Sequence, residues 1–150
     1  MRGEALDDLV PATDRLLQAN GAYRTIAIGD GGNELGMGSL RAGLMPRITH
    51  GELIFCATPA DYVIPAGISN WGAYALAASL AVLSGTPILI RPEDELAVLE
   101  AQVAVGAVDG CTRKNEVSVD GVPIGDYLQT VSAIYAGCQA YLAATQVAAA

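Results

Sequence analysis

One glycine-rich run, residues 26–38, constrains this chain more than any other stretch. A short apolar segment, Ile26-Ala27-Ile28, leads into a loop in which five glycines fall within ten residues, at positions 29, 31, 32, 36 and 38. Glycine costs backbone entropy, so this density indicates tight turns or close approach of the backbone to something bound. The polar side chains of the loop are Asp30, Asn33 and Glu34, and none is basic. This composition suits a hard cation, or a polar substrate held through one, better than a bare phosphate.

The known glycine-rich nucleotide motifs do not fit this loop. A dinucleotide fingerprint starting at Gly29 requires its third glycine at position 34, where the chain has Glu34. Gly31 and Gly36 have the spacing of a P-loop, but Met37 follows in place of the lysine. We therefore expect no nucleotide cofactor. The alternative to a binding loop is a purely structural turn between a strand and a helix.

Composition excludes several classes of protein. The length of 150 residues is that of a single domain, and with 52% apolar and 16% charged residues the chain is not disordered. The formal net charge is −8 and there is no basic patch, so we expect no nucleic-acid partner. An anionic small-molecule substrate would need local positive charge from a metal or a helix N-terminus.

The cysteines and the apolar segments bear on the compartment. Three cysteines without a C-x-x-C pair argue against a disulfide framework or a structural zinc site and favour a reducing cytoplasm. The N-terminus lacks the apolar core of a secretory signal. The apolar stretch 73–90 is interrupted by Ser84-Gly85-Thr86-Pro87, so we expect a buried helix and strand there and no membrane association.

The apolar periodicity predicts alternating helices and strands. The predicted helices are 6–19, 35–44, 73–83, 93–105 and 126–147, and the predicted strands are 25–28, 52–56, 62–64 and 87–90. The Asp-Gly pairs at 109–110 and 120–121 indicate a small hairpin region. The acidic run Glu93-Asp94-Glu95 is interpreted as a solvated first helical turn. This alternation predicts an α/β fold, a mostly parallel sheet with helices on both faces.

Three polar clusters follow extended apolar segments, and parallel sheets place their ligands at such strand ends. They are Asp30/Asn33/Glu34 after strand 25–28, Ser69-Asn70 after strand 62–64 and its short extension, and Asp109 after Ala107-Val108. Either Ser69 or Asn70 also makes a good N-cap, a role compatible with binding an anion at the same helix end.

Two further side chains are candidates for the site. Trp71, the only tryptophan, suits packing at the rim better than a substrate platform. His50, the only histidine, has an ordinary pKa near neutrality, although a lone loop histidine is more often structural.

Several motifs together resemble the C-terminal domain of the D-glutamate cyclase family. They are G-D-G-G-N-E-L-G-M-G at 29–38, H-G-E at 50–52, Cys56, Ala60-Asp61, G-I-S-N-W-G-A-Y-A-L at 67–76, and V-D-G-V-P at 119–123. The resemblance covers residues 24–123 of one domain and implies reversible interconversion of D-glutamate and 5-oxo-D-proline, formally a hydro-lyase reaction. The family domain extends further upstream than residues 1–23 here, which implies an incomplete version of a larger domain. A histidine that the family tends to carry after V-D-G-x-P has no counterpart near Tyr127.

The residues themselves suggest a mechanism for such a reaction. A divalent cation, Mg²⁺ or Mn²⁺, would be held by Asp30 and Glu34, with Asn33 as a further ligand, and would polarise the ring carbonyl or activate water. Glu34 or Asp109 would move the proton, Asp30 would share in catalysis, and His50 would be the reserve. Substrate binding is expected at Gly31, Gly32, Asn33, Ser69, Asn70 and Trp71.

Two other functions remain open from the sequence. The same acidic loop would serve a metal-dependent hydrolase, for example a phosphatase acting on a small phosphate ester. The third possibility is a non-catalytic domain that binds a small anion and is completed by a partner or a second copy covering an exposed sheet edge. We expect a cytoplasmic protein, with a mitochondrial setting also open for family members.

Overall fold

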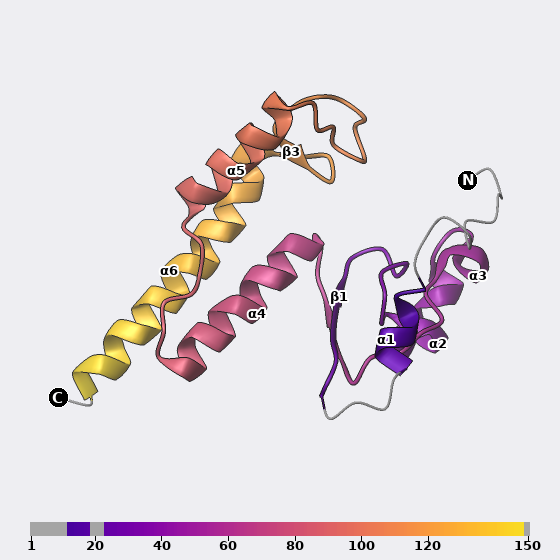
Figure 1. Cartoon of the computed structure of the whole chain (residues 1–150), viewed down its shortest axis with the longest axis horizontal. Coiled ribbons are helices and arrows are strands. Elements are labelled where there is room, and N and C mark those ends of the chain that lie inside the picture. Colours follow the sequence, from indigo (N-terminus) through magenta and orange to yellow (C-terminus); the bar gives the residue numbers. More distant parts are fainter. Residues whose placement is uncertain (1–11, 19–22, 149–150) are drawn as a thin grey trace. The chain divides into compact units, whose positions relative to one another are not determined.

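The structure, a computed structural model, describes residues 12–18 and 23–148. The chain consists of two compact units, Met1–Ser69 and Asn70–Ala150, and each is described by itself (Figure 1). The single-domain organisation expected from the length stays a prediction. Within the described residues, no helix is long and apolar enough to cross a membrane.

The first unit is built around a two-stranded parallel sheet. Strands β1 (Ile26–Gly29) and β2 (Tyr62–Pro65) pair in register from Ile26 opposite Tyr62 to Gly29 opposite Pro65. The connection between them carries the short helical segments η1 (Gly38–Leu40), α2 (Arg41–Leu44), η2 (Met45–Arg47) and α3 (Gly51–Ile54). Helix α1 (Asp14–Gln18) precedes β1, and the rest of the predicted helix 6–19 lies outside the described residues except at positions 12 and 13.

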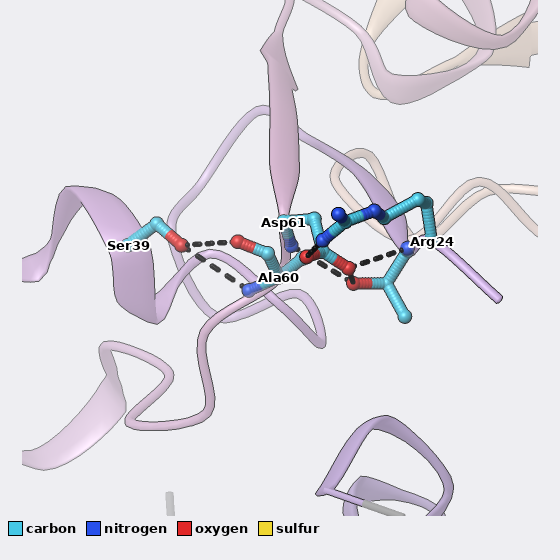
Figure 2. Close-up of polar contacts among 5 residues, drawn as sticks. Arg24, Ser39, Ala60 and Asp61 are labelled. Carbon is cyan, nitrogen blue, oxygen red and sulfur yellow. Dashed lines mark hydrogen bonds and ion pairs between the residues drawn. The ribbon is translucent and has the colours of Figure 1, made fainter. Parts of the chain in front are cut away.

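Polar contacts fix the beginnings of both strands (Figure 2). The Asp61 carboxylate accepts hydrogen bonds from the Thr25 backbone N–H at 2.8 Å and from the Thr25 hydroxyl at 2.9 Å, and it pairs with Arg24 at 3.0 Å. The Thr25 donors and Arg24 hold the pKa of Asp61 below its ordinary value. Nearby, the Ser39 hydroxyl donates to the Ala60 carbonyl at 2.8 Å and accepts from the Ala60 N–H at 3.1 Å. These contacts set the parallel register, so the carboxyl ends of β1 and β2 lie side by side.

The second unit is mostly helical. Helix α4 (Ser69–Ser84) begins at the last residue of the first unit and is followed by α5 (Pro92–Ala104), the hairpin β3 (Ser118–Val119) with β4 (Val122–Pro123), and α6 (Ile124–Ala148). Figure 1 shows α5 alongside α6. The hairpin turn has positive φ at both Asp120 and Gly121, as a tight two-residue connection requires. The apolar core of this unit comprises Ala81, Cys138 and Leu142, with Ala78, Val82 and Leu89 packed against it.

Most predicted elements are confirmed, and two are wrong. Strands 25–28 and 62–64, helices 73–83, 93–105 and 126–147, and the hairpin correspond to observed elements. The predicted strand 52–56 is wrong, because α3 occupies Gly51–Ile54 and Leu53 is 84% exposed. The predicted buried strand 87–90 is also wrong, because that segment pairs with no strand and Ile88 is 53% exposed. The predicted helix 35–44 is regular only from Gly38 onward.

The α/β class agrees with this mixture of helices and small sheets. The finer expectation differs from what is described, because the strands form two separate two-stranded sheets, one parallel and one antiparallel. Short apolar runs such as Leu53-Ile54-Phe55 cannot be assigned to strand or helix by periodicity alone, which explains the strands that were wrongly predicted.

Candidate functional site

The glycine loop after β1 is closed by its own carboxylate. Glu34 Oε1 accepts from the backbone N–H groups of Asp30 at 3.2 Å and Gly31 at 2.9 Å, and Oε2 accepts from the N–H of Gly32 at 2.8 Å. Three successive backbone N–H groups form the concave arrangement in which proteins bind anions. Partial burial acts to raise the pKa of Glu34, but the bonds from Gly31 and Asp30 outweigh it and lower that pKa. The anion in this concavity is therefore part of the chain.

The loop glycines make room for neighbouring side chains of the same unit. Gly32 has φ of +86°, and a Cβ there would lie 2.7 Å from Cδ2 of the buried Phe55 ring. Gly36 has φ of +94°, and a Cβ there would lie 2.5 Å from Cβ of Ala27. The glycines therefore allow the backbone to approach side chains of the protein itself, while the predicted approach to a bound molecule stays a prediction.

Asp30 and Ser69 meet at the carboxyl ends of the two strands. Asp30 Oδ2 accepts from the Ser69 backbone N–H at 2.8 Å and from the Ser69 hydroxyl at 2.6 Å. Ser69 of the second predicted cluster therefore lies against Asp30 of the first, at the ends of two parallel strands. Asp30 caps the beginning of α4, so the Ser69 donors predicted to bind a substrate carboxylate are already bonded to a carboxylate of the chain.

The described residues do not fit a divalent cation at this loop. Both oxygens of Glu34 accept backbone N–H groups, Asp30 Oδ2 accepts two donors from Ser69, and Asn33 is exposed. Within the described ranges, no three His, Cys, Asp or Glu side chains lie close enough together to hold a metal ion. Carboxylates that serve as acceptors for N–H donors are not arranged as an oxygen cage for Mg²⁺ or Mn²⁺. The cation stays a prediction.

His50 is in the first unit, in the connection between β1 and β2. It has φ of +59° and immediately precedes α3. It lines an open cavity of about 360 Å³ together with Met45, Pro46, Ile48, Gly51, Glu52 and Leu53. None of the other predicted site residues lines this cavity, and the catalytic role of His50 stays a prediction.

Asp109 in the second unit holds two loops together. Its Oδ1 accepts from the N–H groups of Cys111 at 2.7 Å and Thr112 at 2.9 Å. Its Oδ2 accepts from the Ser118 hydroxyl at 2.6 Å and from the Gly121 N–H at 2.9 Å. These donors, Ser118 first, hold the pKa of Asp109 well below its usual range. A carboxylate this strongly bonded is a poor proton acceptor near neutral pH, so the geometry favours a structural role over the predicted proton transfer.

Asn70 and Trp71 converge on one tyrosine of α6. Asn70 Nδ2 donates to the Tyr127 hydroxyl at 3.3 Å, and Trp71 Nε1 donates to the Tyr127 carbonyl at 3.3 Å. The rings of Trp71 and Tyr127 stack at 6.0 Å between centroids with an interplanar angle of 21°. The expected packing role of Trp71 agrees with this half-buried position.

Behind Tyr127 lies a carboxylate that sequence reasoning missed. The Tyr127 hydroxyl donates to Glu95 Oε1 at 2.8 Å, and Glu95 is only 5% exposed. The expectation that residues 93–95 form a solvated turn is therefore wrong for Glu95. Its position four residues before Leu99, on the apolar side of the helix, was the available signal. Tyr127 had no comparable signal, since one tyrosine in a long apolar helix is not distinctive.

Comparison with known proteins matches these motifs to one family. The family model described as "D-glutamate cyclase-like, C-terminal" matches residues 1–135. A human protein named "D-glutamate cyclase, mitochondrial" is 41% identical over 80 residues. That alignment covers 53% of this chain and 12% of the human protein, so the chain spans only a small part of that relative.

Proposed function

Since this chain belongs to the D-glutamate cyclase-like, C-terminal family, we propose that it catalyses the reversible interconversion of D-glutamate and 5-oxo-D-proline. The observation that carries the proposal is the family match over residues 1–135. The human relative whose name states this activity supports it, and its 41% identity is too high for chance resemblance over 80 residues. The proposed class is a lyase that removes water.

The reaction requires two things of a protein site. In the closing direction the amine nitrogen attacks the side-chain carboxyl carbon, the C–N bond forms, and water leaves. In the opening direction water adds to the ring carbonyl, the C–N bond breaks, and the nitrogen takes up a proton. The site must therefore hold the reacting nitrogen against the carboxyl carbon and must exchange protons with it.

The geometry favours Asn70 and Trp71 as substrate-binding residues. Both lie in the first turn of α4, both are fixed by Tyr127, and Asn70 is exposed. The donors of Ser69 and the N–H groups of Gly31 and Gly32 are engaged with carboxylates of the chain, which does not favour the substrate-binding role predicted for them. The proton-transfer roles of Asp30, Glu34, Asp109 and His50 stay predictions.

A time course followed by ¹H NMR tests the activity. Purified chain is incubated with D-glutamate and, separately, with 5-oxo-D-proline, with and without added Mn²⁺, and the L-enantiomers serve as controls. We expect both D-compounds to approach the same equilibrium mixture while the L-compounds stay unchanged. A folded chain that converts neither compound under any of these conditions would refute the activity for this chain by itself.

A second function has one observation in its favour. The glycine loop satisfies its own backbone donors, and the β1–β2 sheet has two strands with Ile26 47% and Tyr62 60% exposed. This suits a non-catalytic domain completed by a partner or a second copy along a sheet edge. It predicts self-association in sedimentation velocity together with the absence of turnover. No observation on the described residues favours a phosphatase.

A further inference from the structure

Glu95 is a buried carboxylate whose described partners are neutral. It lies in the first turn of α5, where the helix dipole favours an anion, and it is 5% exposed. Among the ion pairs of the described residues, none involves Glu95. Its Oε1 accepts from the hydroxyl of Tyr127, a residue with 0% exposure, and Tyr74 is a further hydrogen-bond partner. Burying a carboxylate without a cation carries a large desolvation cost, so a buried Glu95 is an unexpected choice for a position that serves only packing.

The carboxylate determines the direction of a chain of hydrogen bonds. Burial, and after it the bond to Glu95, raises the pKa of Tyr127 to about 12, so the hydroxyl keeps its proton at neutral pH. Burial and the Glu95 carboxylate also raise the pKa of Tyr74 well above its ordinary value. In this hydrogen bond the Glu95 oxygen is the acceptor, and a phenol has one proton to donate. Tyr127 donates that proton to Glu95, so its oxygen must accept from its other partners.

The other partners are the Tyr74 hydroxyl and the side-chain amide of Asn70, and it is Asn70 that is exposed. An amide can place either its nitrogen or its oxygen against a hydroxyl, and the hydrogen-bond network decides which. Because the Tyr127 oxygen is an acceptor, Asn70 presents Nδ2 to it, at 3.3 Å. The carbonyl oxygen Oδ1 is then the atom that Asn70, an exposed residue, can offer to a ligand.

Trp71 holds the tyrosine in place. It stacks on the Tyr127 ring and donates from Nε1 to the Tyr127 carbonyl at 3.3 Å. The hydroxyl therefore has little freedom to move away from Asn70. A change at Glu95 alters where the Tyr127 hydroxyl proton points, and this in turn alters which atom of the Asn70 amide faces the Tyr127 oxygen.

We propose that Glu95 is a positioning residue that acts through the Tyr127 hydroxyl to turn the Asn70 carbonyl oxygen toward the reacting nitrogen of the substrate. This inference rests on the proposed function. The same nitrogen carries N–H bonds in both compounds, as the amine of D-glutamate and as the lactam N–H of 5-oxo-D-proline. A carbonyl acceptor therefore suits both directions of the reaction, whereas an amide turned the other way would present a donor to a donor.

The test uses conservative variants with matched controls. Glu95→Gln keeps the size of the side chain and removes its charge, and Tyr127→Phe removes only the hydroxyl. Glu100→Gln on α5 and Tyr141→Phe on α6 make the same chemical changes at exposed positions. Glu95→Gln and Tyr127→Phe are the relay variants, since each interrupts the relay of hydrogen bonds from Glu95 through Tyr127 to Asn70. We expect KM for both substrates to rise roughly five- to tenfold in each relay variant, the effect of one lost hydrogen bond, with a smaller change in kcat. The controls should match the wild type.

Two comparisons separate the relay from a general packing defect. In the double variant Glu95→Gln/Tyr127→Phe, KM should equal that of Tyr127→Phe alone, because the proposal has Glu95 reach Asn70 only through the Tyr127 hydroxyl. Asn70→Ala, at an exposed helix end, should raise KM by a similar factor in protein whose circular dichroism spectrum matches that of the wild type. Additive effects in the double variant, or a wild-type KM for Asn70→Ala, would overturn the proposal.

An NMR signal of the Asn70 side chain tests the relay without requiring that the protein convert substrate. The ¹⁵N-labelled side-chain amide of Asn70, assigned by its loss in Asn70→Ala, should shift in Glu95→Gln and Tyr127→Phe but not in the two controls. If the wild type converts no substrate, the proposed function fails while these signals still report on the relay. Unmoved Asn70 signals in both relay variants would refute the relay whatever the activity.

Discussion

Gly32→Ala should destabilise the first unit because the loop approaches the protein's own Phe55. An alanine at φ of +86° costs roughly 1–2 kcal/mol in backbone strain. Its Cβ would also lie 2.7 Å from Cδ2 of Phe55, a ring that is only 4% exposed. Overpacking against a buried side chain costs roughly 1–3 kcal/mol more. We therefore expect the free energy of unfolding to fall by roughly 2–5 kcal/mol.

Two matched glycines separate strain from overlap. Gly85 has φ of +66° but open space around a Cβ, so Gly85→Ala carries strain alone and should cost roughly 1–2 kcal/mol. Gly43 lies in α2 with no atom within 4 Å of a Cβ, so Gly43→Ala should be neutral or stabilising by roughly 0.5–1 kcal/mol.

Urea unfolding followed by far-UV circular dichroism measures all three variants. With a slope of about 1–3 kcal/mol/M, Gly32→Ala should lower the midpoint by roughly 1 M or more. The order should be Gly43→Ala, then Gly85→Ala, then Gly32→Ala, from most to least stable. A midpoint for Gly32→Ala at or above that of Gly85→Ala would refute the argument that Phe55 requires glycine there.

Three further predictions concern the buried and bonded side chains. Glu34→Ala leaves three backbone donors without their acceptor and should lower the free energy of unfolding in urea by roughly 1–3 kcal/mol at pH 7. Because the pKa of Glu34 is lowered, its contribution is present above pH 4.5, and the difference in stability between wild type and variant should shrink as the pH falls further. The pKa of Asp109 is also lowered, so the wild type should lose stability as the pH falls below 3.8. In thermal melts between about pH 2 and 6, the melting temperature of Asp109→Asn should therefore fall less steeply toward acid pH than that of the wild type, and an equally steep fall in both proteins would contradict the lowered pKa. Tyr127 has a raised pKa of about 12, so stability present below pH 10 should be lost, by up to about 2–3 kcal/mol, as the pH rises toward 12. Tyr127→Phe should lose less stability over this range, and thermal melts in which both proteins lose the same amount would count against the buried hydroxyl.

Local sequence patterns predicted the elements that depend on local chemistry. The strand before the glycine loop, the strand ending at Pro65 and the three long helices have periodicities and end signals that lie within a few residues of one another. The segment 52–56 failed because a three-residue apolar run fits either structure, and the chain there places Leu53 at the surface. Asp30 and Ser69 were each placed after a predicted strand, where parallel sheets hold ligands, but their contact across 39 residues of chain is seen only in the structure.

The candidate site was harder to predict because its key contacts are tertiary. Five glycines among carboxylates have the same composition whether the backbone approaches a ligand or approaches Phe55 and Glu34. Glu95 and Tyr127 lie 32 residues apart, and nothing local shows that a hydroxyl of α6 meets the first turn of α5. Only the packing of the helices determines that a residue in an acidic run becomes buried.

The carboxylate of Glu34 in the loop has a consequence for how the protein responds to its surroundings. A concavity of backbone N–H groups that binds a free anion is stabilised by mass action, and its melting temperature rises with ligand concentration. Here the effective concentration of the anion is set by a linker of one residue between Gly32 and Glu34, and it cannot be diluted. The order of this loop is therefore uncoupled from the pool of small anions, and dialysis or added phosphate should leave its folding unchanged.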